Sequence, residues 1–239
     1  MKTEDISYDV GGTTYIGTLV VDDRREGTRP GVLLAPEGPG LGDLCRGFAR
    51  RLAELGYVAY AMDYHGGGQV LPMDQIMPRI MAFMAEPQGI RDIATAALKV
   101  LTDQPQTDSG RLAAIGYCFG GTTALELARS GADLKAVVGF HSGLGTARPG
   151  DAANIKAKVL VQIGADDPII PPEQRAAFET EMTAGKVDWR MLLYGGAGHS
   201  FTNPEVGALG RPGFDYDEKT DQRSWRAMLD LFGEVFGAV

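Results

Sequence analysis

The 239 residues carry a formal net charge of −8, and 44% of the side chains are hydrophobic, which allows a sizeable core. The acidic balance argues against a nucleic-acid partner, because binding to phosphates needs a basic face that displaces counterions. The first residues carry acids, and no apolar run approaches the roughly 18 residues that span a bilayer, so we expect neither a signal peptide nor a membrane partner. The two cysteines, Cys45 and Cys118, are too few for a disulfide framework, so we expect a reducing, cytoplasmic setting.

Short apolar runs predict the extended segments. Runs 6–8 and 14–21, joined by Gly11-Gly12, are typical of an antiparallel hairpin. Candidate strands follow at residues 31–35, 58–62, 112–115, 136–140, 158–163 and 188–194. Most of these runs are continuous rather than alternating, which favours strands buried on both faces of a parallel sheet.

Amphipathic helix patterns lie between these runs. The first has Asp43 as a candidate N-cap and ends at Gly56. The others cover residues 90–101, 122–130, a segment opened by Pro171-Pro172, and 221–236. Strands alternating with helices predict an α/β fold, a doubly wound and mostly parallel sheet with the hairpin at its edge. No connection is long enough for a separate lid domain, so we expect one domain over residues 1–239.

Residues 116–121, Gly-Tyr-Cys-Phe-Gly-Gly, join a predicted strand to a predicted helix. This is the G-x-nucleophile-x-G elbow of α/β-hydrolases in the context that it requires. The glycines let strand and helix pack closely, and a helix N-terminus favours the thiolate, the reactive form of Cys118. The alternative is a buried structural cysteine beside a glycine-rich turn. We assign such a packing role to Cys45, which lies within an amphipathic helix.

Two later loops supply an acid and a base. Hydrolases of this fold present their triad in the chain order nucleophile, acid, histidine. The next-to-last predicted strand is followed by Asp166 and Asp167, and the last by a glycine-rich loop with His199. Both loops lie at the sheet edge where open α/β sheets bind ligands. We expect His199 as the base, Asp167 as its orienting carboxylate and Asp166 as a turn residue. His65 and His141 also follow strands, and His65 could face the pocket as well, but a loop histidine is more often a solvated residue than a catalyst.

The chain resembles the dienelactone hydrolase family, the carboxymethylenebutenolidases, from about residue 15 to the end. The matching motifs are residues 35–40 (Ala-Pro-Glu-Gly-Pro-Gly), 116–121, the acid loop 164–171 and 197–201 (Ala-Gly-His-Ser-Phe). The resemblance implies the α/β-hydrolase fold, a catalytic triad of Cys118, Asp167 and His199, and no metal or organic cofactor. It also favours Asp167 over Asp166.

Further roles are implied by the resemblance. Glu37 is expected near the thiol, where it helps to govern ionisation; the alternative is a solvated loop acid. The backbone N–H groups of Gly38 and Phe119 are expected to form the oxyanion hole, and the elbow rule independently places one donor at Phe119. Arg79, as the counterpart of a family arginine, and Ser200 are expected to bind substrate.

The chain departs from the family at one position that matters for substrate binding. Family members that act on dienelactone carry an arginine four residues after the histidine, and Asn203 stands there. Arg211 in the following loop is a candidate replacement. Segment 71–84, with four of the nine methionines, is either one wall of an apolar pocket or a core-packed helix.

Together these features predict a cysteine-dependent hydrolase of a small-molecule ester or lactone, acting through a thioester acyl-enzyme on Cys118. A broad-specificity carboxylesterase or thioesterase is the alternative among enzymes. An interpretation of a different class is a non-catalytic small-molecule binder or a redox sensor that uses Cys118. The sequence does not distinguish a monomer from a homodimer.

Overall fold

The computed structural model describes residues 1–237, so residues 238 and 239 of the expected domain lie outside the described residues. The eight strands within residues 1–237 form one sheet in the order β1-β2-β4-β3-β5-β6-β7-β8. The strands are β1 (Lys2–Val10), β2 (Thr13–Val21), β3 (Arg29–Ala35), β4 (Val58–Ala61), β5 (Thr107–Tyr117), β6 (Ala136–Phe140), β7 (Lys158–Gly164) and β8 (Trp189–Tyr194). Strand β2 is antiparallel to β1 and β4, and all other neighbours are parallel, which confirms the predicted α/β fold.

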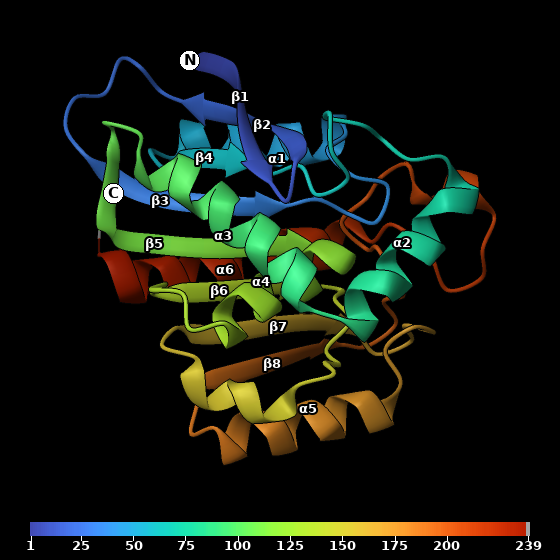
Figure 1. Ribbon diagram of the computed structural model, residues 1–239. Coiled ribbons are helices and arrows are strands. Elements are labelled where there is room, and N and C mark those ends of the chain that lie inside the picture. The colour runs from blue at the N-terminus through green and yellow to red at the C-terminus, as the bar shows by residue number, and fades with distance from the viewer. Residues whose placement is uncertain (238–239) are drawn as a thin grey trace.

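Helices cover both faces of the sheet. They are α1 (Asp43–Glu54), α2 (Met73–Ala85), α3 (Gln88–Thr102), α4 (Phe119–Arg129), α5 (Pro172–Ala184) and α6 (Glu218–Phe236), with short 3₁₀ helices η1 (Pro149–Asn154) and η2 (Val206–Leu209). Helices α3, α4 and α5 pack on one face and α1 and α6 on the other (Figure 1). Neighbouring residues of β6 alternate between the two apolar layers, Val137 in one and Val138 in the other. This burial on both faces explains the continuous apolar runs.

None of the helices in residues 1–237 combines the length and apolar character that crossing a bilayer requires.

The N-terminal hairpin forms as predicted, with β1 at the edge of the sheet. Its turn consists of Gly11 and Gly12, with φ of 57° and 81°. A two-residue turn with positive φ at both positions matches the right-handed twist of the flanking strands, and glycine adopts it without strain.

Two predicted helix starts are wrong. Asp43 does not cap α1: Gly42 is the N-cap, and Asp43 is the first helical residue, where its carboxylate still interacts favourably with the helix dipole. Helix α4 begins at Phe119 rather than near Thr122, because it starts directly after the elbow residue Cys118. The predicted end of α1 is confirmed, since Gly56 has a φ of 105° and its amide donates to the Ala53 carbonyl.

Segment 71–84 contains helix α2, but its methionines do not form the core. The inward residues are Ile76, Ile80 and Phe83, each less than one-tenth exposed. Met73, Met77 and Met81 are 56%, 56% and 57% exposed on the adjoining face of the helix. At 100° per residue the two sets fall on different faces, and both are apolar, so the pattern alone could not tell which face packs inward.

Gly120 is a position where only glycine fits. An added Cβ would lie 2.1 Å from the Ala35 carbonyl oxygen and 2.4 Å from that of Pro36. We expect Gly120→Ala to lower the free energy of unfolding by about 3 kcal/mol or more in urea titrations, because backbone on both sides must move. Gly47→Ala is the matched control: this exposed site within α1 has nothing within 4 Å of an added Cβ, and a gain of about 0.5–1 kcal/mol is expected. Equal effects of the two substitutions would contradict this account.

Candidate active site

Cys118 lies at the tip of a sharp turn between β5 and α4. Its backbone has φ 53° and ψ −122°, a conformation that non-glycine residues adopt only where the surroundings enforce it. An added Cβ at Gly116 would lie 2.1 Å from the backbone of Gly120, so the strand and the helix can approach this closely only with glycine at these positions. The turn leaves Cys118 half-buried at the carboxyl edge of the sheet.

Three side chains from separate loops meet at this edge. His199, after β8, places Nε2 3.2 Å from the Sγ atom of Cys118. Its Nδ1 lies 2.8 Å from Oδ2 of Asp167, in the loop after β7. The three groups therefore form one hydrogen-bonded chain, an arrangement in which an imidazole can move a proton to or from a nucleophile.

The two adjacent aspartates have different environments. Asp167 is 5% exposed, and its Oδ1 accepts hydrogen bonds from the amides of Ile169 and Ile170 at 2.8 and 3.3 Å. Asp166 is exposed, and its side chain makes no hydrogen bond within residues 1–237. Only Asp167 is fixed in an orientation that can orient the imidazole of His199.

Electrostatics favour a charged imidazole in this chain. Burial of His199 disfavours the imidazolium, but the nearby Cys118 thiolate and the hydrogen bond to Asp167 outweigh it and raise the pKa of His199 to about 10. An ion pair of thiolate and imidazolium is the reactive state of a cysteine nucleophile.

Two backbone N–H groups are available to donate hydrogen bonds to an anion. The amides of Gly38 and Phe119 donate no hydrogen bond to any backbone group in residues 1–237, and Phe119 is the first residue of α4, where the helix itself cannot use its N–H. The inner face of α2 packs on both residues. Ile76 and Ile80 come within 3.1 and 3.2 Å of a Cβ built on Gly38, and the ring of Phe83 stacks on that of Phe119 at 6.0 Å.

Glu37 belongs to a local hydrogen-bond network rather than to open solvent. Its carboxylate accepts from the Ser200 hydroxyl at 3.2 Å and from Nδ2 of Asn203 at 2.8 Å. Burial raises the pKa of Glu37, and these two hydrogen bonds, together with the charge of His199, partly offset that rise. Glu37 makes no hydrogen bond to Cys118 in the part of the chain that the structure describes.

A pH-dependent stability follows from Glu37. Because its pKa in the folded protein exceeds the ordinary value of 4.5, the folded state keeps a proton that the unfolded chain has already released. This contribution to stability is fully present below pH 4.5 and is lost as the pH rises through the raised pKa. We expect the free energy of unfolding of the wild type to fall relative to Glu37→Gln over this range in urea titrations. Glu54→Gln, at an exposed glutamate ending α1, should show no such divergence, and a parallel profile for Glu37→Gln would contradict the account.

Comparison with known proteins identifies the chain. The model described as the dienelactone hydrolase family matches residues 16–236. The chain belongs to the dienelactone hydrolase family. Members of this family are hydrolases that act on ester or lactone bonds, and the resemblance inferred from the motifs is confirmed.

Several proteins are similar to this dienelactone hydrolase family member over nearly their whole length. A crystal structure of a dienelactone hydrolase-like promiscuous phosphotriesterase from metagenomic libraries is 45% identical, covers 99% of both chains and has a TM-score of 0.94. The structure of m3DLH is 48% identical over 98% of both chains, with a TM-score of 0.96. A Bradyrhizobium protein named "Probable 2-oxo-3-(5-oxofuran-2-ylidene)propanoate lactonase" is 28% identical over 84% of this chain and 86% of its own.

The guanidinium groups of the two candidate carboxylate-binding arginines of this dienelactone hydrolase family member stack on aromatic rings. The guanidinium of Arg79 stacks on Phe83 at 4.5 Å and lines a separate cavity of about 410 Å³ together with His65. Arg211 is exposed, and its guanidinium stacks on the ring of Phe214 at 4.7 Å. The Phe214 ring in turn packs against the ring of His199, with centroids 4.9 Å apart.

Two histidines that were expected to be solvated instead hold the backbone of the site. His141 is fully buried, and its Nδ1 accepts the amide proton of Cys118 at 3.2 Å. His65 Nε2 lies 2.9 Å from the carbonyl oxygen of Gly38 and so donates to it. The sequence feature that could have indicated this role is that both residues follow the carboxyl ends of strands, β6 and β4 respectively, where ligand-binding residues lie in open α/β sheets.

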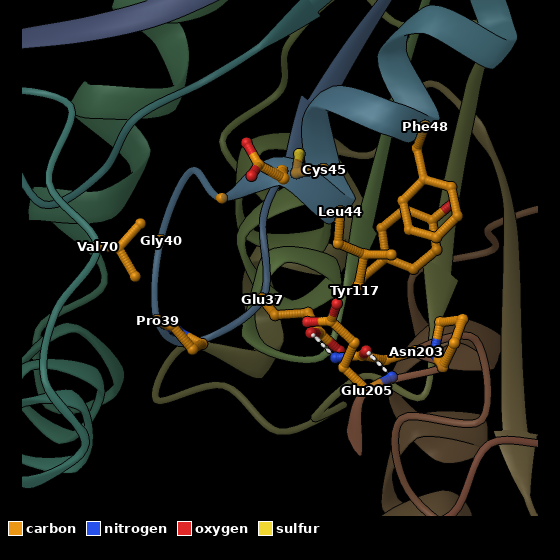
Figure 2. Close-up of a pocket in the computed structure, with 13 residues that line it drawn as sticks. Glu37, Pro39, Gly40, Leu44, Cys45, Phe48, Val70, Tyr117, Asn203 and Glu205 are labelled. Carbon is orange, nitrogen blue, oxygen red and sulfur yellow. Dashed lines mark hydrogen bonds between the residues drawn. The ribbon is translucent and has the colours of Figure 1, made fainter. Parts of the chain in front are cut away.

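A cavity of about 510 Å³ adjoins the Glu37 side of the site. Its wall combines Glu37 and Asn203 with Phe48 and Cys45 of α1, and Figure 2 shows the hydrogen bond between Glu37 and Asn203 at its edge. Cys118 does not line this cavity. Burial raises the pKa of the Cys45 thiol to about 12, which suits the packing role assigned to it.

Proposed function

We propose that this chain hydrolyses an ester or lactone with Cys118 as its nucleophile, through a thioester acyl-enzyme. The single observation that carries the proposal is the continuous chain from Asp167 to His199 to Cys118, with distances of 2.8 and 3.2 Å at the elbow. His199 serves as general base and acid, and Asp167 holds its tautomer and orientation.

In the first half-reaction the Cys118 thiolate attacks the substrate carbonyl carbon. The electron pair of the carbonyl moves to oxygen, where the amides of Gly38 and Phe119 hold the oxyanion. Such donors are commonly worth about 3 kcal/mol of barrier each. When the intermediate collapses, the leaving alcohol or enol takes a proton from the His199 imidazolium, and a thioester remains on Cys118.

In the second half-reaction neutral His199 takes a proton from water, which attacks the thioester carbonyl. The thiolate then leaves, the acid product is released, and the ion pair of Cys118 and His199 is restored. Because a thiolate leaves more readily than an alkoxide, substrates with poor leaving groups return to the starting ester. Enol lactones and activated esters are therefore the favoured substrates.

Asn203, four residues after His199, affects which substrate charge the site favours. Asn203 carries no charge, and its amide already donates to Glu37. A substrate carboxylate therefore gains no ion pair at this position, which favours uncharged esters and lactones over carboxylate-bearing dienelactones.

The test is a substrate panel with direct detection of the intermediate. Dienelactone and p-nitrophenyl esters of rising chain length are compared by kcat/KM, and intact-protein mass spectrometry of rapidly acid-quenched samples searches for one acyl group, mapped to a peptide. We expect turnover, preference for uncharged activated esters, and acylation of Cys118. Turnover with acylation elsewhere would overturn the mechanism. Absence of turnover across the panel by folded protein would favour the binder or sensor interpretation.

Phosphotriester hydrolysis is a second candidate activity. It is favoured by the 45% identity to a promiscuous phosphotriesterase and by the uncharged Asn203, since phosphotriesters carry no net charge. The same thiolate and amides would serve attack at phosphorus. Including paraoxon in the panel tests it, and release of nitrophenol no faster than the uncatalysed rate would exclude it.

A further inference from the structure

One buried ionisable residue beside the triad has no part in the proposed reaction. His141 follows β6 directly and is 0% exposed, although a neutral loop histidine gains nothing from leaving water without hydrogen-bond partners. Its φ is 42°, in the left-handed region that non-glycine residues occupy only where the surroundings over-determine them. Both features indicate that the fold holds this imidazole in one place.

The hydrogen bonds of His141 fix its protonation. The Cys118 amide donates to Nδ1 at 3.2 Å, and the same amide also donates to the Phe140 carbonyl at 2.9 Å. Because a backbone amide can only donate, Nδ1 carries a lone pair, and the single proton of the neutral ring lies on Nε2. That nitrogen is 2.8 Å from Oγ1 of Thr202, which therefore accepts from it. The His141 amide donates to the Gln162 carbonyl of β7 at 2.8 Å.

The same ring contacts both halves of the site. It packs edge-on against the ring of His199, with centroids 5.3 Å apart, and against Phe201 at 5.0 Å. Thr202 lies in the loop that carries His199, whereas Cys118 lies at the elbow. One imidazole thus connects the backbone of the nucleophile to the loop of the base.

We propose that His141 is a positioning residue: as a neutral Nε2–H imidazole it fixes the Cys118 backbone through Nδ1 and the His199 loop through Thr202. This inference rests on the proposed roles of Cys118 and His199. Displacement of reacting groups by about 1 Å can cost a hundredfold in rate, so a side chain that ties two loops together affects turnover without touching substrate.

Protonation of His141 would break this arrangement. An Nδ1–H would point at the Cys118 N–H, and a second positive charge would adjoin the imidazolium of His199. The titratable groups that face the ring are His199, Cys118 and Tyr117, whose ring centroid lies 6.1 Å from that of His141. Burial raises the pKa of Tyr117 well above its usual range, so its hydroxyl stays neutral. Phe140, Phe201 and Thr202 are not titratable. Burial, followed by repulsion from charged His199, holds the pKa of His141 well below its usual range, so the ring stays neutral at working pH.

Two amide replacements separate the two hydrogen bonds. In His141→Asn the side-chain oxygen takes the place of Nδ1 and can accept from the Cys118 amide, whereas in His141→Gln the amide takes the place of Nε2 and only the bond to Thr202 is kept. We measure kcat and KM for a p-nitrophenyl ester, and the rate of iodoacetamide alkylation of Cys118 by peptide mass spectrometry. We expect His141→Gln to lose about tenfold or more in kcat and alkylation with KM little changed, and His141→Asn to stay within about threefold of the wild type.

Two further measurements test the proposal even if thermal melts show that a His141 variant is misfolded. They are the alkylation rate of Thr202→Val and nuclear magnetic resonance of the wild type. Thr202→Val preserves shape and removes the acceptor, so it should lower alkylation, by about threefold. In the wild type, ¹⁵N spectra should show His141 neutral with its proton on Nε2. A proton on Nδ1, or a His141→Gln variant as active as His141→Asn, would overturn the inference. Alkylation and spectra need no turnover, so loss of the proposed function would appear separately, as a wild type that hydrolyses no ester.

Discussion

Cys118→Ala is expected to lower kcat/KM for an activated ester by about ten-thousand-fold or more, because it removes the atom that forms the acyl bond in the proposed mechanism. What remains is the modest acceleration from the oxyanion amides and from binding. The measurement is initial-rate kinetics on a p-nitrophenyl ester, with mass spectrometry to show that the variant forms no acyl-enzyme.

Cys45→Ala is the matched control for the loss of a thiol. Cys45 is buried in α1 and takes no part in the hydrogen bonds that join the triad residues, so this variant should keep its kcat while losing some stability to the small cavity that it creates. Thermal unfolding of both variants shows whether either is misfolded. Full esterase activity in a folded Cys118→Ala variant would refute cysteine catalysis.

The elbow and the triad could be predicted because their constraints are local. Gly116 and Gly120 are required by contacts across one turn, and the positions of Asp167 and His199 follow from the order of strands, each at a carboxyl end. Such constraints determine which residue types stand at fixed positions, so they are visible in the sequence. The same logic explains why the hairpin at Gly11 and Gly12 was predictable.

Side-chain direction could not be predicted in the same way. The sequence places His141 after a strand, but only packing determines that its ring turns inward, under the elbow, with a positive φ. In α2 the isoleucines and the methionines form two apolar faces, and the choice between them depends on Gly38 and Phe119, which are distant in sequence. Long-range contacts of this kind leave no periodic signal.

The role of Asn203 can be understood only from its contacts in the structure. In the sequence it is the loss of a family arginine. In the structure its amide, together with the Ser200 hydroxyl, holds the Glu37 carboxylate beside the His199 loop. The uncharged amide at this position therefore fixes an internal acid through a hydrogen bond.

His199→Gln is the second substitution with a large expected effect, about a thousandfold on kcat near neutral pH. Glutamine can place an amide near the position of Nε2, so the volume of the site is largely kept, but it cannot exchange a proton. In the proposed mechanism both half-reactions need that exchange: the first to protonate the leaving group, the second to activate water.

The pH dependence of His199→Gln separates its two roles. At alkaline pH any thiol forms thiolate without a partner, so alkylation and acylation of Cys118 should recover as the pH is raised above about 8.5. Hydrolysis of the thioester should not recover in parallel, because no base activates water, and the acyl-enzyme should accumulate in quenched samples. In the wild-type acyl-enzyme the charge of the Cys118 thiolate, which raises the pKa of His199 in the free enzyme, is absent, so His199 can act as the base and no such accumulation is expected near neutral pH. If turnover of His199→Gln recovered together with acylation, His199 would serve only to ionise Cys118, and its assignment as the base in deacylation would fail.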